Sequence, residues 1–184
     1  MASLTGKEIK LLVKQMLCTT LNFRHAPKSG EFTCWAGCYR MLENYHTKQP
    51  QKFKRFLALQ NPTCKIQHCE LTPCTSCDRR REKDNYLSDL IKLGYKQSVQ
   101  LSAYANSGTI TSYLQQKQPL MVYRDYGDDT GHVMIISGIV VKFPSASTLI
   151  VVNDPDKHKG ELVDLVDFCM GNGNPWIDTW IAKK

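Results

Sequence analysis

Three runs of β-branched and other apolar residues between positions 119 and 155 constrain the fold of this chain more than any other feature. The runs are PLMVYRDY, GHVMIISGIVVKF and STLIVVNDP, and turn-forming segments (YGDDTG and PSAS) separate them. Apolar runs of this length, divided by residues such as Gly, Asp, Pro and Ser, are typical of consecutive antiparallel strands. The sequence therefore predicts an antiparallel meander in the C-terminal half.

The N-terminal half shows helical rather than strand periodicity. Apolar side chains recur at i, i+3 and i+4 spacing over residues 7–18 and again over residues 34–46. Thr33 is a suitable N-cap for the second segment, which would place Cys34 in the first helical turn. Because helices come first and the sheet second, we expect an α+β fold rather than alternating βαβ units.

Between these two parts the pattern predicts a helix, a short strand and a second helix. The predicted ranges are 84–95, 96–101 and 107–118. Ser107 or Thr109 is the expected cap of the last helix, and the tail after residue 170 is expected to form a closing strand or turn with two packing tryptophans.

Length and composition favour one domain covering residues 1–184. The chain has 184 residues, of which 42% are hydrophobic and 22% charged, which suits a single core. No stretch reaches the roughly 18 consecutive apolar residues of a membrane span, and the first residues lack the apolar core of a signal peptide. We therefore expect neither a membrane span nor an ordinary secretion signal.

The net charge of +7 is concentrated in the N-terminal half. Residues 1–92 contain 16 basic and 8 acidic side chains, whereas residues 93–184 contain 8 and 9. A basic half is compatible with nucleic acid, an anionic membrane or an acidic protein partner, and also with a merely solvated surface. The charge alone does not choose among these.

Four of the eight cysteines crowd into the segment 62–83, which we interpret as an insertion. Cys64, Cys69, Cys74 and Cys77 have a spacing that lets four thiolates surround a tetrahedral zinc ion, with His68 as a substitute ligand. Two local disulfides or unconnected thiols are the alternatives. The missing signal peptide favours the metal.

Cys34, His132 and Asp154 form a candidate catalytic set. Unpaired backbone N–H groups and the helix dipole favour a thiolate at the start of a helix. His132 opens the second predicted strand of the meander and Asp154 follows the third, so neighbouring strands would bring the two side chains together. A thiol facing a histidine that a carboxylate orients is the arrangement of thiol acyl-transfer catalysis.

Three short motifs resemble those of papain-like cysteine peptidases. They are the segments 33–36 (TCWA), 131–133 (GHV) and 152–155 (VNDP), in the family order of Cys, His and then Asn or Asp. The resemblance extends over roughly residues 20–156 and is closest to the compact C39-like and C70-like branch, which includes bacterial effector proteases and toxin peptidase domains.

The resemblance implies a papain-like fold in which the nucleophile helix packs on an antiparallel sheet. It also implies that Cys34 is the nucleophile, His132 the general base and later acid, and Asp154 the orienting residue, with Asn153 as its rival. No cofactor is expected for catalysis. The three remaining cysteines are expected to pack in the interior: Cys18, Cys38 and Cys169.

One position departs from the family pattern. Relatives usually carry a glutamine about six residues before the cysteine, where its amide stabilises the oxyanion, but this chain has Lys28 there. Lys28, His25 or Asn22 could supply the donor together with the backbone N–H of Cys34. Loss of one such donor typically costs on the order of 10²–10³ in rate.

These features favour a cysteine endopeptidase of the bacterial effector or toxin type, acting on protein substrates. Such a protein would leave its cell without a signal peptide and act in the cytoplasm of a target or host cell, with cytoplasmic residence as the alternative. An immunity or activating protein is a further expected partner, whereas nucleic acid is not expected. Deamidation or acyl transfer by the same triad, and an inactive zinc-stabilised binding module, remain alternatives.

Overall fold

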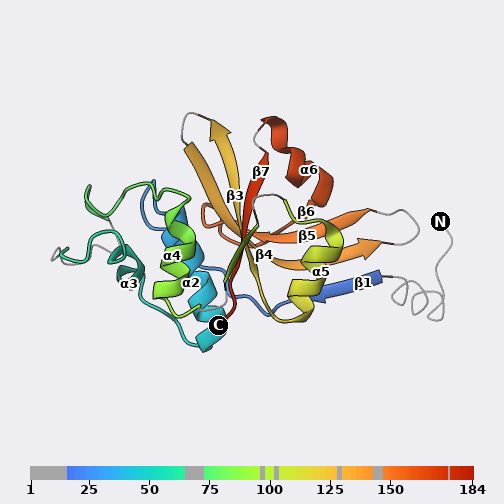
Figure 1. Cartoon of the computed structure of the whole chain (residues 1–184), viewed down its shortest axis with the longest axis horizontal. Helices are drawn as coiled ribbons and strands as arrows, with labels where there is room; N and C mark the ends of the chain where they lie inside the picture. Colours follow the sequence, from blue (N-terminus) through green and yellow to red (C-terminus); the bar gives the residue numbers. More distant parts are fainter. Residues whose placement is uncertain are drawn as a thin grey trace.

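A seven-stranded antiparallel sheet forms the centre of the molecule, with helices on both faces (Figure 1). The computed structural model describes residues 16–64, 73–95, 98–101, 104–127, 130–142, 147–173 and 175–184. The strands are β1 (Met16–Thr20), β2 (Val99–Leu101), β3 (Leu120–Gly127), β4 (Thr130–Lys142), β5 (Thr148–Asn153), β6 (Glu161–Asp164) and β7 (Trp176–Ile181). Their order is β2-β7-β3-β4-β5-β6, and β1 pairs with β4.

The predicted meander is confirmed as β3, β4 and β5. Along β3, Met121 and Tyr123 contribute to one apolar cluster, and Leu120 and Val122 contribute to a second one. Successive side chains of a strand point to opposite faces, so the central strands are buried on both sides. This double burial explains why their sequences are almost continuously apolar rather than alternating.

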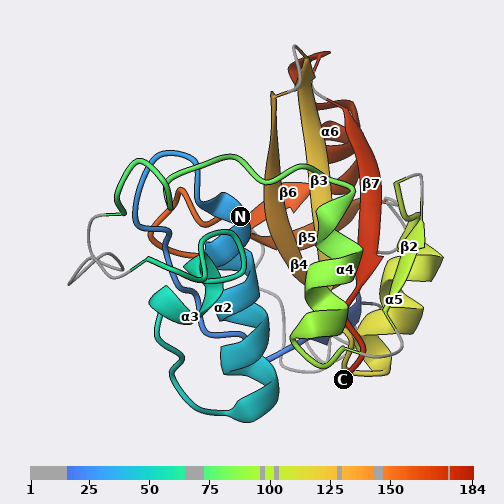
Figure 2. The same cartoon turned by 60° about the vertical axis from the view of Figure 1, so that its left-hand side comes forward.

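The helices divide between the two faces. They are α2 (Cys34–Thr47), α3 (Lys54–Leu57), α4 (Asn85–Lys92), α5 (Ser107–Gln115) and α6 (Leu165–Met170), followed by a 3₁₀ turn η1 (Gly171–Gly173). Figure 2 shows α2 and α4 side by side, and both contribute to the first cluster, whereas α5 and α6 contribute to the second. In the part of the chain that the structure describes, no helix is long and apolar enough to span a membrane. The α+β class is confirmed.

The predicted helix over residues 7–18 is wrong at its end. Residues 1–15 lie outside the described residues, and Met16–Thr20 is strand β1. The expected packing of Cys18 in the interior is also wrong, because this strand position is exposed. β4 is longer than its partner β3, which pairs with it from Thr130 to Ile136, and β1 pairs with β4 from Gly138 to Lys142. The free edge of a long strand outweighs a helical periodicity that is only a weak preference.

The other local predictions are largely confirmed, with one correction. The helices α4 and α5, the short strand β2 and the closing strand β7 all form where expected. However, α5 is capped by Asn106, whose side chain accepts a hydrogen bond from the N–H of Thr109 at 2.9 Å, and not by Ser107 or Thr109. Asn106 has the extended backbone that an N-cap requires.

Candidate active site

Cys34 is the first residue of α2 and is partly exposed. Thr33 occupies the cap position, as predicted, but its hydroxyl donates to the carbonyl of Ser29 at 2.7 Å instead of capping the helix. The thiol therefore lies at the positive end of the helix dipole, in a turn that Thr33 ties to the preceding loop.

Cys38, one turn further along α2, holds the helix against the sheet. It is fully buried, and its thiol donates to the backbone carbonyl of Val133 at 3.4 Å. Burial, followed by the negative charges of Cys34 and two nearby aspartates, raises the pKa of the Cys38 thiol well above its usual value. Cys38 is therefore a packing residue, as expected, and it fixes α2 beside the residue that follows His132.

Gly37 lets α2 approach the loop after β5. A Cβ atom at Gly37 would lie 2.7 Å from the Cβ of Pro155, closer than real side chains come. The backbone N–H of Lys28 donates to the carbonyl of Pro155 at 2.9 Å and holds the same contact from the other side. The sequence offered a signal for this contact, because an isolated glycine inside a helix usually has a packing reason.

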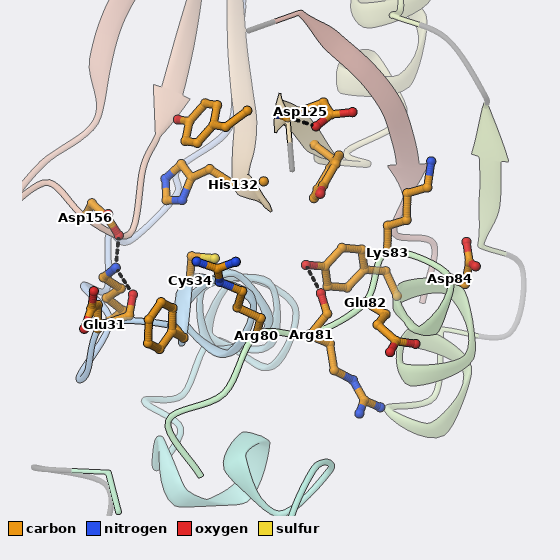
Figure 3. Close-up of a pocket in the computed structure, with 17 residues that line it drawn as sticks. Glu31, Cys34, Arg80, Arg81, Glu82, Lys83, Asp84, Asp125, His132 and Asp156 are labelled. Carbon is orange, nitrogen blue, oxygen red and sulfur yellow. Dashed lines mark hydrogen bonds and ion pairs between the residues drawn. The ribbon is translucent and has the colours of Figure 1, made fainter. Parts of the chain in front are cut away.

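His132 and Asp154 lie within hydrogen-bonding distance of each other. The Nε2 atom of His132 is 2.6 Å from Oδ1 of Asp154, which also accepts the backbone N–H of Asp156 at 2.9 Å. Cys34 lines the same cleft as His132, and because Asp154 occupies Nε2, the nitrogen left to face the thiol is Nδ1. Figure 3 shows Cys34 and His132 facing each other across the cleft.

The surroundings favour a charged His132–Asp154 pair. Burial alone lowers the pKa of His132, but its hydrogen bonds to Asp154 and Cys34 and the negative charges there outweigh burial and raise the pKa to about 10. Burial raises the pKa of Asp154, but the hydrogen bond and charge of His132 outweigh it, so this pKa lies below its ordinary value. The result is an imidazolium of His132 beside the carboxylate of Asp154.

Asn153 points into a different environment from Asp154. Its amide nitrogen donates to the hydroxyl of Ser137 at 2.7 Å, and the residue is buried. Asn153 is the last residue of β5 and pairs with Ile135, so Asp154 follows just beyond the ladder, toward the end of β4 that carries His132. The register thus separates the two rival positions.

Of the three candidates for the oxyanion donor, Lys28 lines the cleft, whereas Asn22 is exposed and is not part of the cleft lining. Its ammonium group lies 2.9 Å from the carboxylate of Asp156 and donates to the carbonyl of Glu31. The Nε2 atom of His25 lies 2.8 Å from the carbonyl oxygen of Lys157, and His25 is not among the described residues that line the cleft.

The cleft has a volume of about 940 Å³ and lies between two unlike walls. We call residues 28–33 and 78–84 the loop wall, and the paired ends of β3 and β4, which carry Tyr126 and His132, the sheet wall. The ring of Tyr126 stacks on that of His132, with centroids 6.3 Å apart and planes at 17°. Sequence reasoning had not singled out Tyr126.

Three of the four clustered cysteines lie together next to the loop wall. The Sγ atoms of Cys64 and Cys74 are 3.9 Å apart, and with Cys77 all three lie within 4.8 Å of one another. No disulfide joins Cys64, Cys74 and Cys77 to one another, so among them the disulfide alternative does not hold. Zinc–sulfur bonds of about 2.3 Å in a tetrahedron place two sulfurs about 3.8 Å apart, so the cluster could hold a metal ion. Cys69 and His68 lie outside the described residues.

Comparison with known proteins gives a family match and several similar solved structures. Residues 15–170 match the family model described as the papain-like cysteine protease AvrRpt2. No curated protein sequence matches the chain. The crystal structure of UfSP from C. elegans is similar, with a TM-score of 0.48 and 12% sequence identity, over 90% of this chain and 34% of that one. The chain thus spans about a third of the length of that structure.

Proposed function

This chain belongs to the AvrRpt2 family of papain-like cysteine proteases, and we propose that it cleaves proteins with Cys34 as nucleophile, His132 as general base and acid, and Asp154 as the orienting residue. One observation carries the assignment of residues: His132 lies 2.6 Å from Asp154 on one side and faces Cys34 across the cleft on the other (Figure 3). The side chains of Cys34 and His132, which would contact the substrate, line the same cleft.

The proposed reaction has two halves. The Cys34 thiolate attacks the carbonyl carbon of the peptide bond, and the imidazolium of His132 gives its Nδ1 proton to the departing amine, which leaves a thioester. His132 then takes a proton from water, the hydroxide attacks the thioester, and the carboxylic acid is released with the thiol restored. Asp154 holds the imidazole at Nε2 throughout and stabilises its charged form.

We further propose that Lys28 replaces the family's glutamine as one donor to the oxyanion, with the backbone N–H of Cys34 as the other. Lys28 lines the cleft, and its ammonium can give up part of its contact with the exposed Asp156. If so, Lys28→Ala lowers kcat by about 10² and Lys28→Gln retains most of it. Equal rates for Lys28→Ala and the unchanged protein would overturn this assignment.

Replacement of Cys34 tests the protease proposal. We expect Cys34→Ala to abolish cleavage of a denatured protein substrate and labelling by a thiol-directed epoxide, whereas Cys18→Ser, on an exposed strand position, changes neither. Mass spectrometry of the products identifies the reaction. New chain termini support proteolysis, and an added mass of about one unit without cleavage would assign the triad to deamidation instead.

We also propose that the protein acts as an effector inside a target cell, in keeping with its family and with the resemblance to effector and toxin peptidases. Production of the unchanged protein inside target cells should change them, and Cys34→Ala should not. An immunity or activating protein would bind the folded chain and change its cleavage rate. A target-cell effect that survives Cys34→Ala would separate the cellular role from the protease.

Finally, we propose that the metal suited to Cys64, Cys74 and Cys77 is zinc, with Cys69 as the fourth ligand. Soft thiolates in a tetrahedral set select zinc over hard cations. Elemental analysis of the purified protein should find about one zinc per chain. Protein without zinc, purified in reduced form and unable to take it up, would overturn this proposal.

A further inference from the structure

Five consecutive residues, Cys77–Arg81, lead from the cysteine cluster to the surroundings of the nucleophile. Cys77 is fully buried and belongs to the cluster. The backbone N–H groups of Cys77 and Asp78 both bond to the carbonyl of Cys74, at 2.7 and 2.8 Å. The position of Asp78 is therefore fixed by two of the three thiol-bearing residues.

Asp78 holds the loop that precedes Cys34. Its Oδ1 accepts the backbone N–H of Phe32 at 2.8 Å, and its Oδ2 accepts that of Glu31 at 3.1 Å. The neighbouring Gly30 has φ +104° and leaves no room for a side chain, because a Cβ atom there would lie 2.8 Å from Oδ1 of Asp78. A carboxylate on two consecutive N–H groups is a strong, charge-assisted anchor.

Arg79 and Arg80 also contact the residues next to Cys34. The carbonyl of Arg79 accepts the indole N–H of Trp35 at 3.0 Å, and Trp35 is fully buried directly after Cys34. The guanidinium of Arg80 lies 5.0 Å from the ring centre of Phe32. The segment Cys77–Arg81 thus contacts the chain before Cys34, at Phe32, and after it, at Trp35.

We infer that the cysteine cluster, with its metal bound, is the anchor that positions the nucleophile loop, and that Asp78 is the positioning residue through which it acts. This inference rests on the proposed protease and zinc site. The turn after β5 contacts this loop at Lys28, whereas the backbone N–H groups of Glu31 and Phe32, nearer to Cys34, are held by Asp78. With the metal removed, the thiols no longer share a centre, Asp78 shifts, and the loop before Cys34 loses its fixed position.

Substitution of Asp78 tests the positioning step. We expect Asp78→Ala to lower kcat/KM by about 10- to 100-fold, since a displacement of about 1 Å near the reacting group costs up to about 10² in rate. The loss should appear mainly in kcat and in the rate of Cys34 labelling, and the alkaline limb of the pH profile, which His132 sets, should not move. Asp78→Asn keeps one acceptor oxygen and should recover part of the loss. Asp167→Ala, an exposed carboxylate on α6, is the matched control with unchanged rates.

Substitution of Cys74 tests the link to the metal. We expect Cys74→Ser to lose zinc and to reproduce the kinetic defect of Asp78→Ala, and the double variant to be no slower than either single one. Zinc loss with full kcat/KM would overturn the inference while leaving both the protease and the zinc site in place. Additive losses in the double variant would also overturn it, because they mean that Asp78 and the metal act separately. Full activity of Asp78→Ala would remove Asp78 from the mechanism.

Discussion

The two walls of the cleft hold the proposed catalytic residues by different means. On the sheet wall, His132 lies within β4, which pairs with β3 on one edge and β5 on the other. On the loop wall, single contacts replace the ladder: Asp78 to two N–H groups, Arg79 to Trp35, and the thiol cluster behind them. A ladder spreads its support over many bonds, whereas the loop wall depends on a few side chains whose loss has no substitute.

This difference predicts unlike responses to mutation. A side chain lost from the sheet wall should alter chemistry while the backbone stays in place. A side chain lost from the loop wall should move the backbone itself or destabilise the domain. The following experiments test that contrast, from the largest expected effect to the smallest.

Asp154→Ala should give the largest effect, a fall in kcat/KM of about 10³- to 10⁴-fold, because His132 loses the group that orients and charges it. The pKa of His132, raised to about 10 by Asp154 and Cys34, should fall. Activity needs the imidazolium and is lost as the pH rises through this pKa, so the alkaline limb should move to lower pH. Asn153→Ala should cost stability through Ser137 and leave that limb in place; a limb that moves in Asn153→Ala instead would reverse the assignment.

The same pair gives the protein a defined dependence of stability on pH. A folded-state pKa of about 10 lies above the ordinary value of 6.5, so the folded protein binds the His132 proton more tightly than the unfolded chain. Its contribution to the free energy of unfolding is complete below about pH 6.5 and is lost as the pH rises toward about 10. Chemical denaturation across this window should show the decline in the unchanged protein and a flatter curve in Asp154→Ala.

Arg81→Ala tests the loop wall by stability rather than rate. Arg81 makes two bonds of 2.6 and 2.7 Å to Asp89, a fully buried carboxylate of α4. Removal of the arginine takes away the main partner of this carboxylate and leaves Tyr39 and Lys92 as its partners in the described part of the chain. We expect a loss of about 3–5 kcal/mol in the free energy of unfolding by urea. Lys92→Ala, which removes a mostly exposed partner of the same carboxylate, should cost less than about 1 kcal/mol. Equal losses of stability in Arg81→Ala and Lys92→Ala would contradict the role of Arg81 as the main partner of Asp89.

Much of the sheet wall could be predicted from the sequence, because its signals are local. The apolar runs predicted β3, β4 and β5, and the positions of His132 and Asp154 at their ends predicted that the two would meet, as the 2.6 Å contact confirms. Membership of the papain-like cysteine protease family is confirmed by the family match over residues 15–170. The catalytic roles of the individual residues stay predictions.

The loop wall was much harder to predict, for a physical reason. Its contacts join residues about 45 positions apart, such as Asp78 to Phe32 and Arg79 to Trp35, and no periodicity encodes them. The cysteine spacing predicted that the thiols would gather, but not that the next residue, Asp78, would reach the nucleophile loop. The strand β1 was missed for a similar reason, since only the free edge of β4 determines it.

Gly37→Ala should have the smallest effect, and it tests the contact between α2, which carries Cys34, and the turn after β5, which carries Asp154. Alanine favours a helix over glycine by about 1 kcal/mol, but overpacking costs about 1–3 kcal/mol, and the new Cβ would lie 2.7 Å from the rigid ring of Pro155. The clash should outweigh the helix preference, with a net loss of about 1 kcal/mol in the free energy of unfolding. We also expect kcat/KM to fall about tenfold, because the Asp154 turn moves away from His132. Gly108→Ala in α5 is the matched control, because its Cβ would meet only Asn106 at 3.4 Å, and it should be neutral or slightly stabilising with unchanged rates. If Gly37→Ala were stabilising and fully active, α2 and the Asp154 turn would not need their close contact, and Cys34 and Asp154 would be positioned independently of each other.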